Sequence, residues 1–272
     1  MIDFSYDGEK LSDYGCMVTG VVTSFAESVP VSTALSLETI RNRTDYHNKI
    51  INMDYDGVIT ATFDICKNPC LFDTQEKMSF TDGEVSHYMR WLHRESYYKF
   101  KPIYDNANYS DVYFYGTFTS ISEIIVGGNI IGFTLTFTSN SPFGYVDDKE
   151  YNVTVKEANG QFVFYDDSDK IGYLYPYYFQ VECLASGKLR ISNDRDTKAT
   201  VIENCVSGEI ITMDCLNKVI QSSEVHSRLY NDFNYNYPRI QNSYDNRKNV
   251  FTTSLPCNIT IRYAPTRKAG IV

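Results

Sequence analysis

Residues 131–138 read Ile-Gly-Phe-Thr-Leu-Thr-Phe-Thr, and this strict alternation decides the fold class. In an extended chain the large apolar side chains would lie on one face, with Gly132 and the threonines on the other. The pair Gly127-Gly128 stands just before this stretch and is typical of a tight hairpin turn. Residues 121–126 are therefore expected to pair with it, which gives a β-hairpin with one buried face.

The same alternation recurs elsewhere in the first half of the chain. Residues 59–65 alternate apolar and polar side chains, and the turn signal Asp56-Gly57 precedes them, so residues 50–54 are expected to be the partner strand. Residues 112–119 form another expected strand, dense in Tyr and Phe. The whole chain has 272 residues with 23 Tyr and 16 Phe against one Trp. Because Tyr and Phe fit half-buried pleated surfaces, the fold is predicted to be mainly β.

One segment departs from the strand pattern. Thr81 and Glu84 have the spacing of a capping box, which marks the start of a helix. Apolar residues then repeat at helical spacing, at Val85, Tyr88, Met89 and Leu92. These residues predict a short amphipathic helix over residues 83–94, with Trp91 packed against the sheet.

A domain boundary is expected near Ser141-Pro142-Phe143-Gly144, where Pro and Gly end a strand and the acidic pair Asp147-Asp148 follows. This gives domains at residues 1–146 and 147–272. In the second domain, residues 151–155 and 162–164 are expected to be the arms of a hairpin that turns at Asn159-Gly160. Further hairpins are expected at Ser186-Gly187 and Ser207-Gly208. Short strands at this spacing indicate a β-sandwich.

The net charge of −9 is concentrated in the first domain, where residues 1–146 carry 18 Asp or Glu against 10 Lys or Arg. This surplus disfavours direct binding to nucleic acid, because that affinity is built from cationic contacts. No apolar run is long enough for a transmembrane helix, and the N-terminus has no signal-peptide pattern. We therefore expect synthesis in the cytoplasm without export, no membrane partner, and seven free cysteines.

The sequence carries no motif for catalysis or for a cofactor. It has no glycine-rich phosphate loop, no paired histidines of a zinc protease and no nucleophile elbow. Asp166, Asp167 and Asp169 form an acidic loop that lacks the Gly and distal Glu of a calcium loop, so we interpret it as a solvated turn. We expect no catalytic, cofactor-binding or metal-binding residues, and we expect that the protein is not an enzyme.

The surplus of tyrosine leaves a carbohydrate-binding function open, because aromatic faces stack on sugar rings. The second domain has no Trp for this purpose, but several tyrosines could substitute: Tyr175, Tyr177, Tyr178, Tyr235 and Tyr237. Tyrosines that alternate in strands more often serve packing. An assembly protein and a carbohydrate-binding protein therefore remain as two separate hypotheses.

Short motifs in order along almost the whole chain resemble the distal tail protein (Dit) family of long-tailed, siphophage-type bacteriophages. The N-terminal motifs are Phe4-x-Tyr6-x-Gly8, Ser12-Asp13-Tyr14-Gly15, residues 84–92, and Phe133-x-Leu135-x-Phe137 followed by Ser141-Pro142-Phe143-Gly144. The C-terminal motifs are Tyr175-Pro176, residues 208–214 and Asn249-Val250-Phe251. Each motif is short, so the resemblance depends on their order and spacing.

The resemblance implies an N-terminal β-sandwich-like domain with one helix that assembles into a hexameric ring, and a C-terminal galectin-like β-sandwich outside that ring. It implies a virion structural protein of the tail tip or baseplate, a hub that joins the tail tube protein to the tail-tip or receptor-binding proteins. DNA would pass through the lumen without specific binding. Carbohydrate-mediated host adhesion by the C-terminal domain is the alternative function.

The candidate ring interface lies in the strand arms between residues 25 and 63. Apolar residues at mostly even spacing would leave a strand pair with apolar surface and unpaired backbone, which a neighbouring subunit would cover. Two arginines could meet the acidic surplus of the adjacent subunit. The candidate interface residues are Val29, Val31, Leu35, Leu37, Ile40, Arg41 and Arg43. The alternative is that these arms fold back into their own sandwich.

Overall fold

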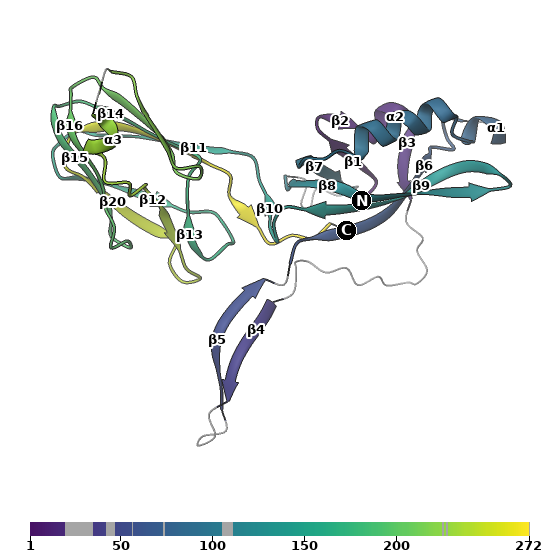
Figure 1. The fold of residues 1–272 in the computed structure, drawn as a ribbon, viewed down its shortest axis with the longest axis horizontal. Helices are drawn as coiled ribbons and strands as arrows, with labels where there is room; N and C mark the ends of the chain where they lie inside the picture. Colours follow the sequence, from purple (N-terminus) through teal and green to yellow (C-terminus); the bar gives the residue numbers. More distant parts are fainter. Residues whose placement is uncertain are drawn as a thin grey trace. The chain divides into compact units, whose positions relative to one another are not determined.

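The structure is a computed structural model that describes residues 1–19, 35–41, 47–55, 57–72, 74–104, 111–224, 226 and 228–271. The chain is mainly β and divides into two compact units (Figure 1). The first unit contains Met1–Tyr145 and Arg267–Val272, and the second contains Val146–Thr266. The predicted mainly β fold class is therefore confirmed.

The first unit is built on a seven-stranded sheet in which every neighbouring pair of strands is antiparallel. A 3₁₀ helix, Leu11–Tyr14, lies between the second and third strands of the sequence. The spatial order of the strands is β2 (Glu9–Lys10), β1 (Asp3–Tyr6), β7 (Tyr98–Ile103), β8 (Phe114–Val126), β9 (Asn129–Ser139), β6 (Thr60–Lys67) and β3 (Cys16–Thr19).

This sheet curls back on itself. Phe4 on β1 and Phe63 on β6 lie four strands apart in the sheet, yet their ring centroids are 5.6 Å apart. A flat sheet would separate these strands by about 19 Å, since neighbouring strands lie about 4.8 Å apart. The backbone N–H of Val18 on β3 also donates to the carbonyl of Ile2, beside β1, at 3.2 Å. The curl encloses an aromatic core and gives the first unit two layers, as in a β-sandwich-like domain.

The predicted helix is confirmed as α2 (Asp82–Leu92). Its capping box is complete, because the Thr81 hydroxyl accepts from the N–H of Glu84 and the Glu84 carboxylate accepts from the N–H of Thr81. Trp91 is buried and its indole N–H donates to the Tyr6 carbonyl at 3.1 Å. A second, shorter helix is α1 (Gln75–Met78). Across the described parts of the chain, no helix has the length and apolarity needed to cross a membrane.

One of the two hairpins predicted in the first unit is confirmed and the other is wrong. Strands β8 and β9 pair across Gly127-Gly128, both with positive φ angles. Residues 50–54 do not pair with residues 59–65: they lie in β5 (Asn48–Tyr55), which pairs with β4 (Leu35–Arg41). Strand β6 lies instead between β9 and β3. The local turn signal was overridden because Phe63 and Ile65 pair opposite Leu135 and Phe133 in the core.

The second unit is a β-sandwich of a five-stranded and a four-stranded sheet. Aromatic rings join the two sheets in one core, as Phe164 and Tyr263 show with centroids 5.3 Å apart. The five-stranded sheet has the order β11 (Lys149–Val155), β21 (Cys257–Tyr263), β14 (Tyr178–Cys183), β17 (Ile210–Asp214), β18 (Val219–Ser222). The four-stranded sheet has the order β12 (Gly160–Tyr165), β20 (Lys248–Thr253), β15 (Gly187–Asn193), β16 (Thr200–Cys205).

Three of the turns predicted in the second domain are present as connections, but they do not make hairpins. The turn at Asn159-Gly160 joins β11 to β12, and the turns at Ser186-Gly187 and Ser207-Gly208 join β14 to β15 and β16 to β17. Each of these pairs of strands belongs to different sheets. The hairpin predictions are wrong because a tight turn signal reports only that the chain reverses. In this sandwich the reversal carries the chain across the core.

The remaining elements are short. Strands β13 (Gly172–Leu174) and β19 (Ile240–Asn242) form a two-stranded sheet, and helix α3 (Leu229–Asp232) precedes β19. Strands β10 (Gly144–Tyr145) and β22 (Thr266–Arg267) lie where the chain passes from one unit to the other. The terminal residues Arg267–Val272 cluster with the first unit, although the sequence assigned them to the second domain. Ala269 and Ile271 in this segment are buried, and the removal of apolar side chains from water favours this position.

Candidate assembly interface

Strands β4 and β5 form a hairpin, here called the exposed hairpin, that does not join the seven-stranded sheet (Figure 1). Every residue of β4 is exposed. The large apolar side chains of the two strands are between 52% and 60% exposed: Leu35, Leu37, Ile40, Ile50, Ile51 and Met53. An isolated two-stranded hairpin is at best marginally stable in water. The exposed hairpin therefore carries an apolar surface that is more than half exposed.

The register sorts the side chains of the exposed hairpin onto two faces. Directly opposed residues share a face, which puts Leu35 with Tyr55 and Leu37 with Met53. The polar pairs Ser36–Asp54 and Glu38–Asn52 lie on the other face. A bulge between Glu38 and Thr39 then brings Ile50 opposite Thr39, on the side of Leu37. One face is apolar and the other is mostly polar.

The residues predicted for the interface do not all lie on the same face of this hairpin. Leu35 and Leu37 lie on its apolar face, whereas Ile40 lies opposite Lys49 on the other face. Arg41 ends β4 opposite Asn48. Val29, Val31 and Arg43 lie outside the described residues. The sequence did not single out the β5 contribution of Ile50, Ile51 and Met53, because residues 50–54 were expected to pair with β6 inside the sheet.

Contacts with the first unit are seen at the end of the exposed hairpin where Tyr55 lies. The ring of Tyr55, the last residue of β5, meets the ring of buried Phe143 edge-on with centroids 4.7 Å apart. The ammonium of Lys268 lies 5.9 Å from the centroid of the Tyr55 ring. These contacts attach the base of the hairpin to its unit, while the apolar residues beyond it remain exposed.

The first unit also has a hydroxyl-rich sheet face. The outward positions of β6 and β9 pair directly across the two strands, and Asp64 is the charged residue among them: Thr60, Thr62, Asp64, Thr134, Thr136 and Thr138. The hydroxyls of Thr62 and Thr136 are 3.1 Å apart, and Thr134 donates to the Asp64 carboxylate at 2.6 Å. Neither strand contributes a cation to these positions, so this face has no charge that would attract phosphate.

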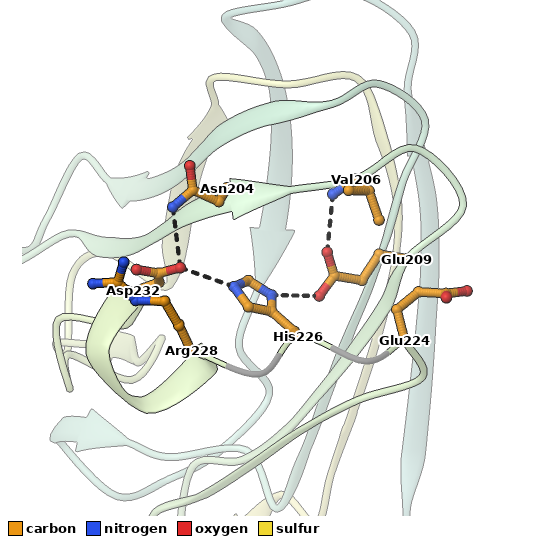
Figure 2. A pocket seen from close by; sticks show the side chains of 7 residues that line it. All are labelled: Asn204, Val206, Glu209, Glu224, His226, Arg228 and Asp232. Carbon is orange, nitrogen blue, oxygen red and sulfur yellow. Dashed lines mark hydrogen bonds and ion pairs between the residues drawn. The ribbon is translucent and has the colours of Figure 1, made fainter.

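The second unit contains a polar pocket with a volume of about 240 Å³ around His226 (Figure 2). The imidazole lies between two carboxylates, with Nδ1 2.8 Å from Oε1 of Glu209 and Nε2 3.2 Å from Oδ2 of Asp232. The side chains of Glu209 and His226 are buried, and that of Asp232 is mostly buried. Arg228, Glu224 and Asn204 complete the polar lining.

Hydrogen bonds set the charge of these groups. Burial alone would lower the pKa of His226, but the hydrogen bonds to Glu209 and Asp232 and the charge of Glu209 raise it above the ordinary value. Burial would raise the pKa of Glu209, but hydrogen bonds from Ser222 and His226 bring it below the ordinary value. Hydrogen bonds from Asn204 and His226 lower the pKa of Asp232. The arrangement favours an imidazolium between two carboxylates.

The described residues contain no group of three or more His, Cys, Asp or Glu side chains arranged to hold a metal ion. The acidic loop is not simply a solvated turn, since Asp166 is buried and its Oδ1 accepts from the N–H of Ser168 at 3.1 Å. That interpretation was wrong because the loop packs against distant residues, with the N–H of Asp166 bonded to the Arg247 carbonyl. Burial raises the pKa of Asp166.

The tyrosines considered for sugar binding are largely engaged by cations and hydrogen bonds. The Lys218 ammonium lies 3.5 Å from the ring centroid of Tyr175 and 5.1 Å from that of Tyr237. The Arg262 guanidinium lies 4.7 Å from the Tyr178 ring. The Tyr177 hydroxyl donates to Asp148, and that of Tyr235 donates to the Tyr230 carbonyl, each at 2.8 Å. Each of the five tyrosines thus has a cation or a hydrogen-bond partner in this unit.

Comparison with known families assigns both halves of the chain. A family model described as the phage tail protein N-terminal domain matches residues 1–141, and one described as the phage tail C-terminal domain matches residues 143–263. The chain belongs to this family of phage tail proteins. No curated protein matches it in sequence.

This phage tail protein has a fold similar to that of a solved hub protein. The crystal structure is that of SPP1 Dit (gp 19.1), described as a paradigm of the hub adsorption apparatus in phages that infect Gram-positive bacteria. The match has a TM-score of 0.65 at 12% identity and covers 97% of this chain and 99% of SPP1 Dit. A chain of the phage P2 baseplate in its activated conformation with Ca gives a TM-score of 0.40 at 9% identity, with full coverage of both chains. At 12% identity, the likeness to SPP1 Dit shows a shared fold, and the predicted resemblance to the Dit family is confirmed at that level.

Proposed function

We propose that this phage tail protein is a Dit-type hub of a siphophage tail, a structural and non-enzymatic component of the tail tip or baseplate. Copies of the chain form a closed ring, a hexamer as in the Dit family, between the tail tube protein and the tail-tip or receptor-binding proteins. The observation that carries the proposal is the exposed hairpin, whose apolar side chains are more than half exposed. The SPP1 Dit-like fold over almost the whole chain supports the same role.

The exposed hairpin supplies the contact between subunits. Its apolar face, with Leu35, Leu37 and Met53, packs on a different surface of the neighbouring copy. A contact between two different surfaces repeats around an axis, so it closes into a ring or continues as a filament. Burying apolar area at about 25 cal/mol per Å² makes such a repeated contact favourable. Residues 29, 31 and 43 belong to the same proposed interface.

The hydroxyl-rich face formed by β6 and β9 is a suitable wall for a channel that conducts DNA. A wall that binds phosphate would retard a passing polyanion, because each cationic contact adds affinity. Thr62, Thr136 and their neighbours offer hydroxyls already bonded to one another, and Asp64 adds negative charge. The acidic surplus of residues 1–146 acts in the same direction.

The protein is made in the host cytoplasm and functions in the virion tail.

The alternative of host adhesion through carbohydrate has less support. A sugar ring needs an accessible aromatic face. The Lys218 ammonium lies over Tyr175 and the Arg262 guanidinium over Tyr178. The hub is therefore the function we adopt. Binding of a glycan by the full chain in an adhesion assay would favour the alternative.

The test replaces two apolar side chains on one face of the exposed hairpin by charged ones. The double variant Leu37→Lys and Met53→Lys puts two ammonium groups on the apolar face and should convert the ring into a monomer. Analytical ultracentrifugation of the full chain measures the mass. The matched control, Ser36→Lys and Asn52→Lys, adds the same charge at adjacent positions on the other face and should leave the ring intact.

Two results would contradict this assignment. A ring that survives Leu37→Lys with Met53→Lys would place the subunit contact elsewhere. Loss of the ring in both double variants would mean that added positive charge, and not the apolar face, is responsible. Circular dichroism of each variant would exclude unfolding as the cause, since substitutions on an exposed surface should leave the core of the unit unchanged.

A further inference from the structure

The segment around α3 covers the edge of the four-stranded sheet of the second unit. Strand β16 is the last strand of that sheet, with β15 as its partner on the other side. Ile202 on β16 forms a bridge with Phe233, and the N–H of Asn234 donates to the Val201 carbonyl at 3.1 Å. The Asn204 amide donates to Asp232 at 3.1 Å. These contacts protect an edge that would otherwise offer unpaired backbone groups.

His226 connects this edge cover to the opposite sheet (Figure 2). Asp232, which accepts from Nε2, is the last residue of α3, and Glu209, beside Nδ1, stands just before β17 of the five-stranded sheet. Glu209 is itself held in place, because its other carboxylate oxygen accepts from the N–H of Val206 at 3.0 Å and Ser222 donates to Oε1 at 2.7 Å. The imidazole is thus anchored to one sheet and bonded to the cover of the other.

We propose that His226 is a protonation-dependent fastener that holds the α3 segment, residues 228–234, over the edge of β16. A protonated imidazolium donates from both ring nitrogens and so satisfies Glu209 and Asp232 together. A neutral imidazole has a single N–H and leaves one carboxylate facing a lone pair. Deprotonation therefore releases one of the two bonds and loosens the cover of the edge strand.

The carboxylates of Glu209 and Asp232 favour the fastened state. Several charged and titratable groups face the ring. They come from each element that borders the pocket: Cys205 at the end of β16, Glu209 before β17, Glu224 after β18, Arg228 before α3, and Asp232 in α3. The raised pKa of His226 decides the direction of the pH effect. The stabilisation is complete below about pH 6.5, the ordinary value for histidine, and is lost as the pH rises through the higher value of the folded protein.

Hydrogen–deuterium exchange of the full chain tests this fastener. Exchange of peptides that cover residues 200–205 and 229–234 is measured at pH 6 and pH 8.5, and each rate is divided by the intrinsic rate at that pH. Protection in the wild-type protein should fall about tenfold between the two conditions, which is the effect of one charge-assisted hydrogen bond. His226→Gln keeps a donor but does not titrate, so its protection should be the same at both pH values.

The control is His93→Gln, the same substitution at an exposed position in the first unit, which should retain the wild-type pH dependence. Equal wild-type protection at the two pH values would overturn the proposal, and so would an unchanged fall in His226→Gln. If His226→Gln does not fold, the ring nitrogens of the wild-type protein are read directly by NMR with labelled histidine. Both nitrogens of His226 should be protonated at pH 6, and a neutral ring there would exclude the fastener.

Discussion

The β8–β9 hairpin and the exposed hairpin of the first unit have similar alternating sequences but different surroundings. The β8–β9 hairpin places Phe133, Leu135 and Phe137 in the core with no exposed surface. The exposed hairpin of β4 and β5 keeps Leu37 and Met53 more than half exposed. Alternation thus predicts which side chains share a face, but it does not predict what covers that face. For β8–β9 the cover lies in the same chain, and for the exposed hairpin we propose that it lies in a neighbouring copy.

The two hairpins also differ in the neighbouring strands that hydrogen-bond to them. The β8–β9 hairpin has a hydrogen-bonded strand on each side, β7 next to β8 and β6 next to β9. Among the described residues, the exposed hairpin pairs within its own two strands, and Tyr55 contacts Phe143 at its base. Because a lone hairpin gains little from its own hydrogen bonds, its order depends on what it packs against. The predictions below test this contrast, beginning with the largest expected effect.

Truncation of a side chain should lower the stability strongly in the β8–β9 hairpin and hardly at all in the exposed hairpin. Phe137 is fully buried and stacks on Phe100 with centroids 4.3 Å apart, so Phe137→Ala should lower the free energy of unfolding by about 3–5 kcal/mol. Leu37→Ala, measured in a dissociated monomer, should change it by less than about 0.5 kcal/mol because the side chain is exposed. Denaturant unfolding followed by the fluorescence of Trp91 measures both. Similar losses for the two variants would mean that Leu37 is buried within its own subunit.

The β8–β9 hairpin also differs from the exposed hairpin in how closely its backbone approaches a neighbouring strand, as Gly132 shows. A Cβ built on Gly132 of β9 would lie 2.5 Å from the carbonyl oxygen of Ile65 on β6. Gly132→Ala should therefore cost about 1–3 kcal/mol, since the two strands must move apart. Gly83→Ala is the matched control, because a Cβ at Gly83 meets no atom within 4 Å and alanine favours the helix. An equal melting temperature for Gly132→Ala and the wild-type protein would contradict the strand pairing of β6 with β9.

The smallest expected effect is on stability at low pH, and it concerns Glu84 of helix α2. The Lys67 ammonium lies 2.8 Å from the Glu84 carboxylate. Burial alone would raise the pKa of Glu84, but the hydrogen bonds from Lys67 and Thr81 lower it below the ordinary value. A lowered value stabilises the fold above the ordinary pKa, and this stabilisation is lost as the pH falls through the lowered value. Thermal unfolding between pH 5 and pH 3 should show a slightly larger loss in the wild-type protein than in Glu84→Gln. An equal loss in both proteins would exclude a contribution from this carboxylate.

Local patterns were sufficient where the decisive contacts are close in sequence. The capping box of Thr81 and Glu84 and the helical spacing after it predicted α2, and Gly127-Gly128 predicted the β8–β9 turn. The same reasoning failed for residues 50–54 and for the turn at Asn159-Gly160. In both cases a tight turn was taken to mean a hairpin. Residues 50–54 pair instead with the preceding strand β4, and the strand before Asn159-Gly160, β11, pairs with the distant strand β21. Turn residues specify a reversal of direction, and long-range packing selects the partner.

The candidate site divides in the same way. Leu35 and Leu37 were visible as alternating apolar residues, and the same alternation puts Ile40 on the other face. The bulge that brings Ile50 to the side of Leu37 is visible only in the register with β5. The His226 cluster was missed because Glu209, His226 and Asp232 have no motif spacing and come from different elements. A lone histidine in a sequence carries no information about its neighbours. The signal that identifies the cluster is burial, which exists only after the sandwich has formed.

The sequence by itself determined the mainly β class, one capped helix, the β8–β9 hairpin and a family resemblance, because these depend on periodicity, capping and turn chemistry within a short window. Only the tertiary structure decided which strands pair, that the first sheet curls until Phe4 meets Phe63, and that the apolar side chains of the exposed hairpin remain more than half exposed. Such features depend on contacts between residues that are distant along the chain. Their free energy comes from burial in a common core, and no short segment of the sequence specifies which residues will share it.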